Sequence, residues 1–159
     1  MDHTALEEIR QLKYRYLRTL DLKEWDGFGA TLSTDVIGSY GSPSGGQPLE
    51  FTGREALVDY MRTALGGNII TVHVANHPEI EVTGETARAS WCLEDTVIVP
   101  DFQITIRGAA YYHDTYVRED GRWVIASTGY QRIYETRTST ADQPGYLITA
   151  NRWAPTEVS

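Results

Sequence analysis

The amino-acid sequence predicts a single α+β domain in which helices come first and a mainly antiparallel sheet follows. A chain of 159 residues has the length of one ordinary domain and can bury a core without metal or disulfide staples. Apolar residues recur at helical spacing only in the first half, and after residue 68 they alternate as in strands. Tight turns between those strands favour a meander with the helices packed on one side of it.

Three helices are expected in the first half of the chain. The first covers residues 4–20, where the apolar side chains form one broad stripe and Thr4 and Glu7 fit a capping box. A second, short helix is expected within residues 22–33. The third covers residues 54–65, directly after a glycine that would precede its first turn.

The second half of the chain is expected to be sheet. Strands are predicted where β-branched and aromatic residues stand between turn signals, and they cover residues 69–75, 79–83, 86–99, 103–118 and 122–134. The last turn contains Asp-Gly, a strong hairpin signal. One more strand, followed by a loop rich in glycine, proline and serine, is expected within residues 35–51. A long curved sheet packed on helices would leave a pocket between the layers.

Composition restricts the partners and the compartment that we expect. The net charge of −8 and the scattered basic residues argue against nucleic acid, whose phosphates are bound by clustered Lys and Arg. No apolar run reaches the roughly 20 residues that span a bilayer, and the N-terminus lacks the apolar segment of a secretory signal. The single cysteine excludes an internal disulfide. We therefore expect a cytoplasmic protein that binds neither membrane nor nucleic acid.

Neither a cofactor nor a metal is expected. The sequence has no phosphate-cradling loop of the G-x-x-x-x-G-K type, and its histidines and carboxylates lack the spacing of metal ligands. Residues 1–135 are expected to form the domain. Residues 136–159 show no clean period but carry apolar side chains, so we expect this tail to dock at the cavity mouth or at a subunit interface.

A histidine stands in the middle of the first long strand. In an extended run, Val72 and Val74 point to one face, whereas Thr71 and His73 point to the other. A half-exposed imidazole on a sheet is the more common outcome for such a residue. The alternative is that His73 faces a pocket and has a chemical role.

Two charged residues fall on apolar faces of predicted strands. Asp95 shares its face with Trp91, and burying a carboxylate without a partner costs free energy. Either the strand has a bulge near Asp95, or a cation and hydrogen-bond donors meet the carboxylate in a pocket. Arg132 follows Tyr130 on the inner row of the last strand and is a candidate for that cation, although it could also reach solvent from the strand end.

Tyr16 and Asp21 lie near the end of the first helix. The helix dipole disfavours a carboxylate there, but Asp21 could cap the second helix, with Glu24 at its third position. Asp21 lies at the margin of the apolar stripe and Tyr16 within it, so both could face a cavity at the helix end. Tyr16 alone would more often be core packing with a satisfied hydroxyl.

Four segments together resemble the SnoaL-like branch of the nuclear transport factor 2-like superfamily. They are IRQLKYRYLRTLDLKEWDGFGATLSTDV, FTGREALVDYM, TVHVANHPEIEV and YYHDTYVREDGRWVIASTGYQRIYE, and the resemblance covers about residues 5–135. It implies a cone-shaped α+β barrel, in which a curved sheet wraps three N-terminal helices around a deep apolar cavity. The sequence is most similar to the bile-acid dehydratases of this branch and also resembles the scytalone dehydratases.

The resemblance implies a set of site residues. The expected catalytic residues are Tyr16 and Asp21 in YLRTLD, His73 in VHVANHPEI, Asp95 in WCLED and Arg132 in GYQRIYE. Four further aromatic residues are expected to line the cavity and bind substrate: Tyr40, Trp91, Tyr112 and Tyr130. Leu20 stands where the scytalone dehydratases have a tyrosine, so their substrate is not implied.

The implied activity is that of a cofactor-independent dehydratase or double-bond isomerase. With Asp21 as its partner, His73 would remove a proton alpha or vinylogous to the carbonyl of a small apolar oxygenated ring, steroid-like or polyketide-like. Tyr16 would donate to the enolate oxygen, and Asp95 and Arg132 would shape the other side of the pocket. The alternatives are a polyketide cyclase or aromatase, and a non-catalytic ligand- or protein-binding module. A homo-oligomer is also implied, with a trimer favoured over a dimer.

Overall fold

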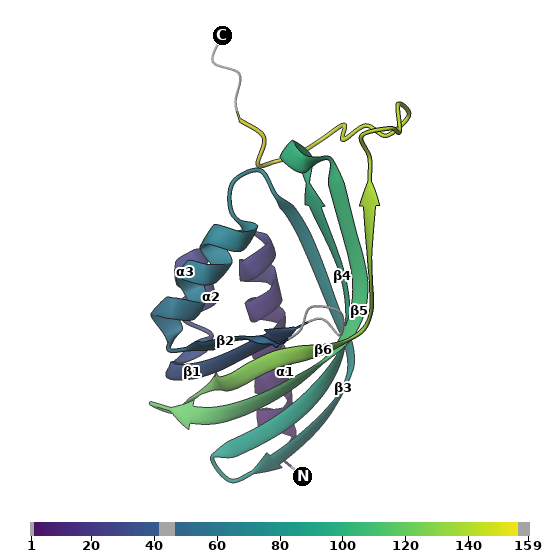
Figure 1. Ribbon diagram of the computed structural model, residues 1–159. Coiled ribbons are helices and arrows are strands. Elements are labelled where there is room, and N and C mark those ends of the chain that lie inside the picture. Colours follow the sequence, from purple (N-terminus) through teal and green to yellow (C-terminus); the bar gives the residue numbers. More distant parts are fainter. Residues whose placement is uncertain (1, 42–46, 156–159) are drawn as a thin grey trace.

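The computed structural model describes residues 2–41 and 47–155 and confirms the α+β class (Figure 1). Within these residues the elements are α1 (His3–Asp21), α2 (Trp25–Gly29), β1 (Leu32–Gly41), β2 (Leu49–Thr52), α3 (Arg54–Leu65), β3 (Ile70–Thr83), β4 (Thr86–Val99), a 3-10 turn (Pro100–Phe102), β5 (Ile104–Glu119) and β6 (Arg122–Ser139). None of the helices in this part of the chain is long and apolar enough to cross a membrane.

The described strands form one curved sheet in the order β2-β1-β6-β5-β4-β3. Neighbouring strands are antiparallel except β1 and β6, which pair in parallel. The long strands bend around the helices, which all lie on one side of the sheet (Figure 1). Strands β2 and β3 are edges, so the sheet is open. The expectation of a barrel is corrected in this respect.

Helix α1 supplies the central layer of the core. It buries a stripe of residues three or four apart along the helix, as the sequence predicts. These are Ala5, Ile9, Leu12, Lys13, Tyr16, Leu17, Thr19 and Leu20. The predicted capping box is wrong, because the N-cap is Asp2, whose carboxylate accepts from the backbone N–H of Ala5 at 3.0 Å.

The other two helices differ in how well the sequence predicts them. Helix α3 has the predicted bounds and follows Gly53, whose φ of 99° suits glycine. Helix α2 is only five residues long, and Leu32 already belongs to strand β1. Its N-cap is Glu24 rather than Asp21, which is the last residue of α1. The interpretation of Asp21 as a cap is therefore wrong, and its carboxylate is free for another role.

Strand β4 has the predicted bounds, whereas the segments 69–75 and 79–83 form one strand, β3. Its register against β4 shifts between Asn76 and Glu79, next to Pro78, which lacks a backbone donor. Strand β2 was not predicted, and part of the predicted glycine-rich loop lies outside the described residues. Strand β6 runs to Ser139, so the first residues assigned to the tail are sheet.

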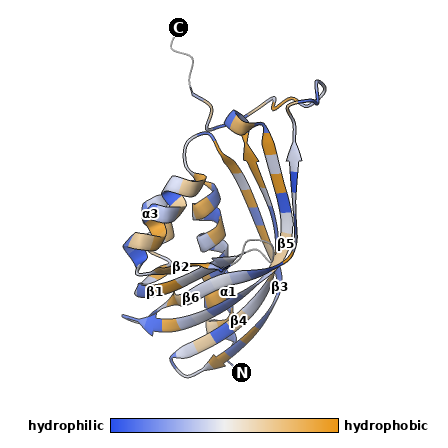
Figure 2. Cartoon of the chain, in the orientation of Figure 1, coloured by the Kyte–Doolittle hydropathy of each residue, from blue (hydrophilic) through white to orange (hydrophobic). Residues whose placement is uncertain are grey.

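The core lies between α1 and the concave face of the sheet. Residues of unlike hydropathy alternate along the long strands (Figure 2). Over much of β4 and β5 every second residue is buried, which is the alternation of a strand with one face on the core. Much of this core is tyrosine, and four of the buried rings are Tyr16, Tyr40, Tyr112 and Tyr116. Burial raises the pKa of each of these phenols above the ordinary value of 10.0.

Because of these buried tyrosines, we expect the free energy of unfolding to fall at alkaline pH. The unfolded chain releases phenol protons near pH 10, whereas the folded chain still holds them, so folding is favoured fully below that pH and progressively less as pH rises through the raised pKa values. Urea unfolding from about pH 8 to about pH 11 should show this decline. Tyr40→Phe should make it shallower, and Tyr14→Phe, at a residue 44% exposed, should not. An equally steep decline in both variants would contradict the assignment.

Candidate active site

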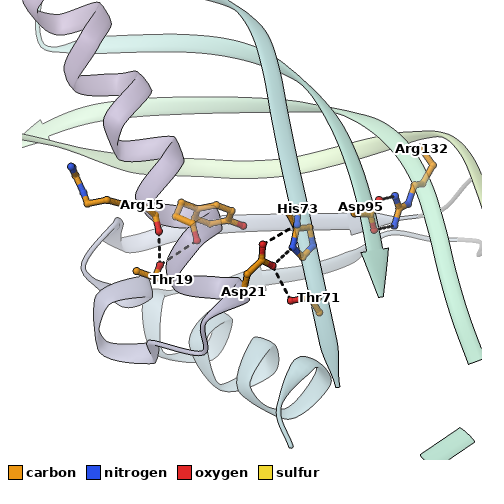
Figure 3. A network of polar contacts seen from close by, with 8 residues as sticks. Arg15, Thr19, Asp21, Thr71, His73, Asp95 and Arg132 are labelled. Carbon is orange, nitrogen blue, oxygen red and sulfur yellow. Dashed lines mark hydrogen bonds and ion pairs between the residues drawn. The ribbon is translucent and has the colours of Figure 1, made fainter. Parts of the chain in front are cut away.

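The end of α1 brings a carboxylate against the edge strand β3. The Nδ1 atom of His73 lies 2.6 Å from Oδ1 of Asp21. The hydroxyl of Thr71 donates to the same oxygen at 2.8 Å, and the backbone N–H of His73 donates to Oδ2 at 2.9 Å (Figure 3). The two side chains are only 9% and 19% exposed. Asp21 and His73 therefore form a preorganised, largely buried pair.

His73 and Thr71 lie on the inner face of β3. Thr71 is buried and the imidazole of His73 nearly so, whereas Val72 and Val74 are 51% and 44% exposed on the outer face. The predicted alternation is confirmed, although the more apolar row points outward. Thr71 and His73 point inward because both hydrogen-bond to the carboxylate of Asp21.

The loop that starts β3 is tied to the end of α1. Lys23, two residues after Asp21, has a φ of 56° and ends the helical path. Its ammonium group donates to the backbone carbonyl of Ile69 at 2.8 Å and lies 4.6 Å from the ring centroid of Trp153 in the tail. The tail thus contacts the chain beside the Asp21–His73 pair. That it covers a cavity mouth or a subunit interface stays a prediction.

Asp95 lies directly across the ladder from His73 and is paired with Arg132. Both Nη atoms of Arg132 donate to the carboxylate of Asp95, with Nη2 at 2.9 Å from Oδ2. The side chains are only 3% and 5% exposed. The register of β4 is regular through Asp95, so the first of the two explanations for this carboxylate, a bulge in its own strand, is wrong. A cation meets it instead.

A bulge does exist, but in β6. Ala110 pairs with Arg132 whereas Ala109 pairs with Tyr134, so β6 carries one extra residue at this point. Beyond the bulge, the carboxylate of Glu135 lies 3.2 Å from Nε of Arg132, a contact that the sequence analysis missed. Burial opposes the charge of Arg132, but the hydrogen bonds to Asp95, together with the neighbouring charges of Asp95 and Glu135 and the nearby Tyr130, outweigh it and raise the pKa of the guanidinium, which stays protonated.

Tyr16 belongs to an aromatic cluster rather than to either charged pair. Its buried hydroxyl lies 2.8 Å from that of Tyr40. The ring of Tyr130 lies 5.4 Å from that of Tyr40 and 5.6 Å from that of Tyr112, between centroids. The ring of Tyr130 also lies 4.8 Å from the guanidinium carbon of Arg132. Three of the four expected substrate-binding aromatics thus gather around Tyr16 and reach the Asp95 pair, and their contact with substrate stays a prediction.

The fourth aromatic, Trp91, belongs to a buried polar network that sequence analysis missed. The Nε1–H of Trp91 donates to Tyr116, which donates to Asp114. The ammonium group of Lys13 lies 2.7 Å from that carboxylate, and neither charged side chain is exposed. The same ammonium group lies 3.4 Å from the ring centroid of Tyr112. The sequence positions of the two charges could have indicated this pair. Lys13 falls within the apolar stripe of α1, and Asp114 stands between Tyr112 and Tyr116 on the buried row of β5.

A surface groove of about 950 Å³ lies between α1, α2 and the turn that joins β5 to β6, apart from this site. Its lining includes Arg15, Glu24 and Trp123 but neither Asp21 nor His73. Among the residues that the structure describes, no group of three or more His, Cys, Asp or Glu side chains could hold a metal ion.

Comparison with known proteins agrees with this architecture. Residues 2–129 match the SnoaL-like domain family. A hexachlorocyclohexane dehydrochlorinase, LinA type 2, has a TM-score of 0.75 at 18% identity over 98% of this chain and 96% of its own. A scytalone dehydratase-like protein from Novosphingobium aromaticivorans has a TM-score of 0.74 at 19% identity, covering 93% and 91%. An NTF2-like protein from Pseudomonas putida has a TM-score of 0.64 at 20% identity, covering 82% and 88%. These likenesses show the fold, and the chain belongs to the SnoaL-like domain family.

Proposed function

We propose that the protein is a cofactor-independent lyase or isomerase that removes a proton beside the carbonyl group of an apolar ring substrate. The observation that carries this proposal is the 2.6 Å contact between Asp21 and Nδ1 of His73. A carboxylate at Nδ1 holds the hydrogen there and leaves the lone pair on Nε2, which can then accept a proton. The other contacts of Asp21 hold the carboxylate in place when the imidazolium forms.

The tyrosine cluster offers a donor for the negative charge that develops on the carbonyl oxygen. In the bond between Tyr16 and Tyr40 one hydroxyl donates and the other keeps its hydrogen for a further acceptor. Burial raises the pKa of both phenols, so both stay protonated at neutral pH. Such a donor stabilises an enolate more than the starting ketone, which is the requirement for catalysis.

The pair of Asp95 and Arg132 would act on a second substrate oxygen. Arg132 has five N–H groups, and its contacts to Asp95 and Glu135 leave further Nη hydrogens for a hydroxyl on the substrate. When the enolate collapses, the C–O bond breaks and the oxygen leaves as water with the proton that His73 had removed. Without a leaving hydroxyl, returning that proton at a different carbon would shift a double bond.

Charge and comparison support an uncharged substrate and an elimination. The two pairs hold three carboxylates, Asp21 beside His73 and Asp95 and Glu135 beside Arg132, against one guanidinium, so the local field is negative and disfavours an anionic substrate. Two similar structures carry names that describe eliminations, a dehydrochlorinase and a scytalone dehydratase-like protein. We propose a small apolar oxygenated ring, steroid-like or polyketide-like, as the substrate, and a homo-oligomer, with a trimer favoured, as the assembly.

A substrate panel tests this proposal. Cyclic β-hydroxy ketones and hydroxylated enones, free and as thioesters, would be incubated with the protein while the absorbance of the conjugated product is followed. The matched control for each compound is the same ring with the carbonyl reduced to an alcohol, which should not react because no enolate can form. Binding of the ketones without any turnover would reject the lyase and isomerase assignment in favour of a binding module, and ring closure instead of elimination would favour a cyclase.

A further inference from the structure

Arg132 reaches Asp95 across an intervening strand. Asp95 lies on β4 and Arg132 on β6, with β5 between them. Neighbouring strands are about 4.8 Å apart, so the two backbones are separated by roughly 10 Å. Arg132 pairs with Ala110 and Asp95 pairs with Gly108, which places the arginine two residues further along the ladder. The arginine side chain must therefore cross β5 diagonally, above position 108.

Position 108 has no room for a side chain. A Cβ atom built on Gly108 would lie 2.7 Å from Nη1 of Arg132 and 3.2 Å from its Cζ. It would also lie 2.8 Å from the backbone oxygen of Tyr134. The guanidinium therefore rests directly on the bare backbone of β5. Glycine is required here by space.

We propose that Gly108 is a positioning residue that sets the place of the Arg132 guanidinium in the active site. The bare backbone lets the guanidinium lie flat over β5 and reach both oxygens of Asp95. Glu135 pairs with Gly108 on the other side and holds Nε at 3.2 Å, and the ring of Tyr130 lies beside the guanidinium carbon. The role of this group toward a substrate rests on the proposed function, but its placement does not.

A methyl group at position 108 has a predictable effect on the contacts of Arg132. The guanidinium would be displaced from β5, and the partner that remains within reach is Glu135, which is on its own strand and 36% exposed. Asp95 would then stay buried opposite His73 without its cation, which is unfavourable because a buried carboxylate needs a partner. Gly108→Ala should therefore separate Arg132 from Asp95 without changing a charged residue.

The first test is a double-mutant cycle on the rate of a panel ketone that the wild type converts. Gly108→Ala is expected to lower kcat about tenfold or more with a smaller change in KM, which corresponds to at least about 1.4 kcal/mol. In an Arg132→Met background the same substitution should have little further effect, because no guanidinium remains to be displaced. An equal loss in both backgrounds would mean that only the backbone contact with Tyr134 matters, and would overturn the proposal.

The second test needs no substrate and separates the two claims. In nitrogen-15 NMR of the ligand-free protein, the Nη–H signals that Arg132→Met removes should be resolved and protected from exchange in the wild type. Gly108→Ala should abolish this protection, whereas Gly145→Ala, where an added Cβ meets nothing within 4 Å, should leave it intact. Protected signals in Gly108→Ala would overturn the proposal. A wild type inert on the whole panel would reject the proposed function, and the NMR result would still decide the role of Gly108.

Discussion

Replacing His73 with alanine is expected to lower kcat on a converted ketone by about 10²–10⁴-fold, the usual contribution of a general base. KM should change much less, because the imidazole contacts the transferred proton in the transition state and does not bind the apolar part of the substrate. Steady-state kinetics of the purified variant measures this directly. Circular dichroism and the unfolding midpoint control for folding, since His73 is near the edge of the sheet and its loss should leave the core intact.

Asp21→Asn should produce a loss of the same kind for a different reason. An amide can present an N–H to Nδ1 of His73, which would hold the ring in the tautomer whose Nε2 carries a hydrogen and cannot accept a proton. Thr71→Val is the matched control, because it removes one hydrogen bond to Asp21 but leaves the contact with His73. Its effect should be clearly smaller. Wild-type rates in both His73→Ala and Asp21→Asn would remove the basis for the proposed mechanism.

Replacing Lys13 with methionine is expected to destabilise the fold by about 3–5 kcal/mol, the range for breaking a buried ion pair from one side. Asp114 would be left without its cation in a part of the core where neither side chain is exposed. The loss should appear as a lower urea midpoint with an unchanged slope. Burial lowers the pKa of Lys13 in spite of the neighbouring Asp114, so this environment opposes charge even when it is paired.

Two further variants separate this effect from a general loss of packing. Lys13→Met combined with Asp114→Leu removes both charges and should recover much of the lost stability, because no charge is left buried alone. Arg18→Met breaks a contact of similar length to Glu24, but the two side chains are 54% and 47% exposed, so its effect should be small. A double variant as unstable as the sum of its single variants would contradict the assignment.

The parts of the fold that follow from local patterns were predictable from the sequence. Strand β4 and helix α3 have the predicted bounds, because each is a periodic segment between clear turn signals. Strand parity predicted that His73 and Thr71 share a face, but not that this face is the inner one, because the more apolar row of β3 points outward. The fold family was also evident from the segments that carry the resemblance, and the match over residues 2–129 confirms it.

The missed features depend on contacts between distant parts of the chain. The bulge in β6 is a mismatch of register with β5, and the sequence of β6 has no glycine or proline at that point to indicate it. Glu135 meets Arg132 only because of that bulge, and Lys13 meets Asp114 only when α1 packs on the sheet. The cap of α1, by contrast, was missed for a local reason, because Asp2 stands two residues before the predicted cap and is itself a good capping residue. Which side chains pair between different helices and strands depends on how those elements pack, and local sequence patterns do not show it.

The most direct test of the central claim is hydrogen exchange at the carbon beside a carbonyl. A cyclic ketone that binds the protein but lacks a leaving hydroxyl would be incubated with it in deuterated water and followed by proton NMR. If Asp21 and His73 form the base, the wild type should replace the α-hydrogens with deuterium, and His73→Ala should do so no faster than buffer. Exchange that proceeds equally well in His73→Ala would contradict the account.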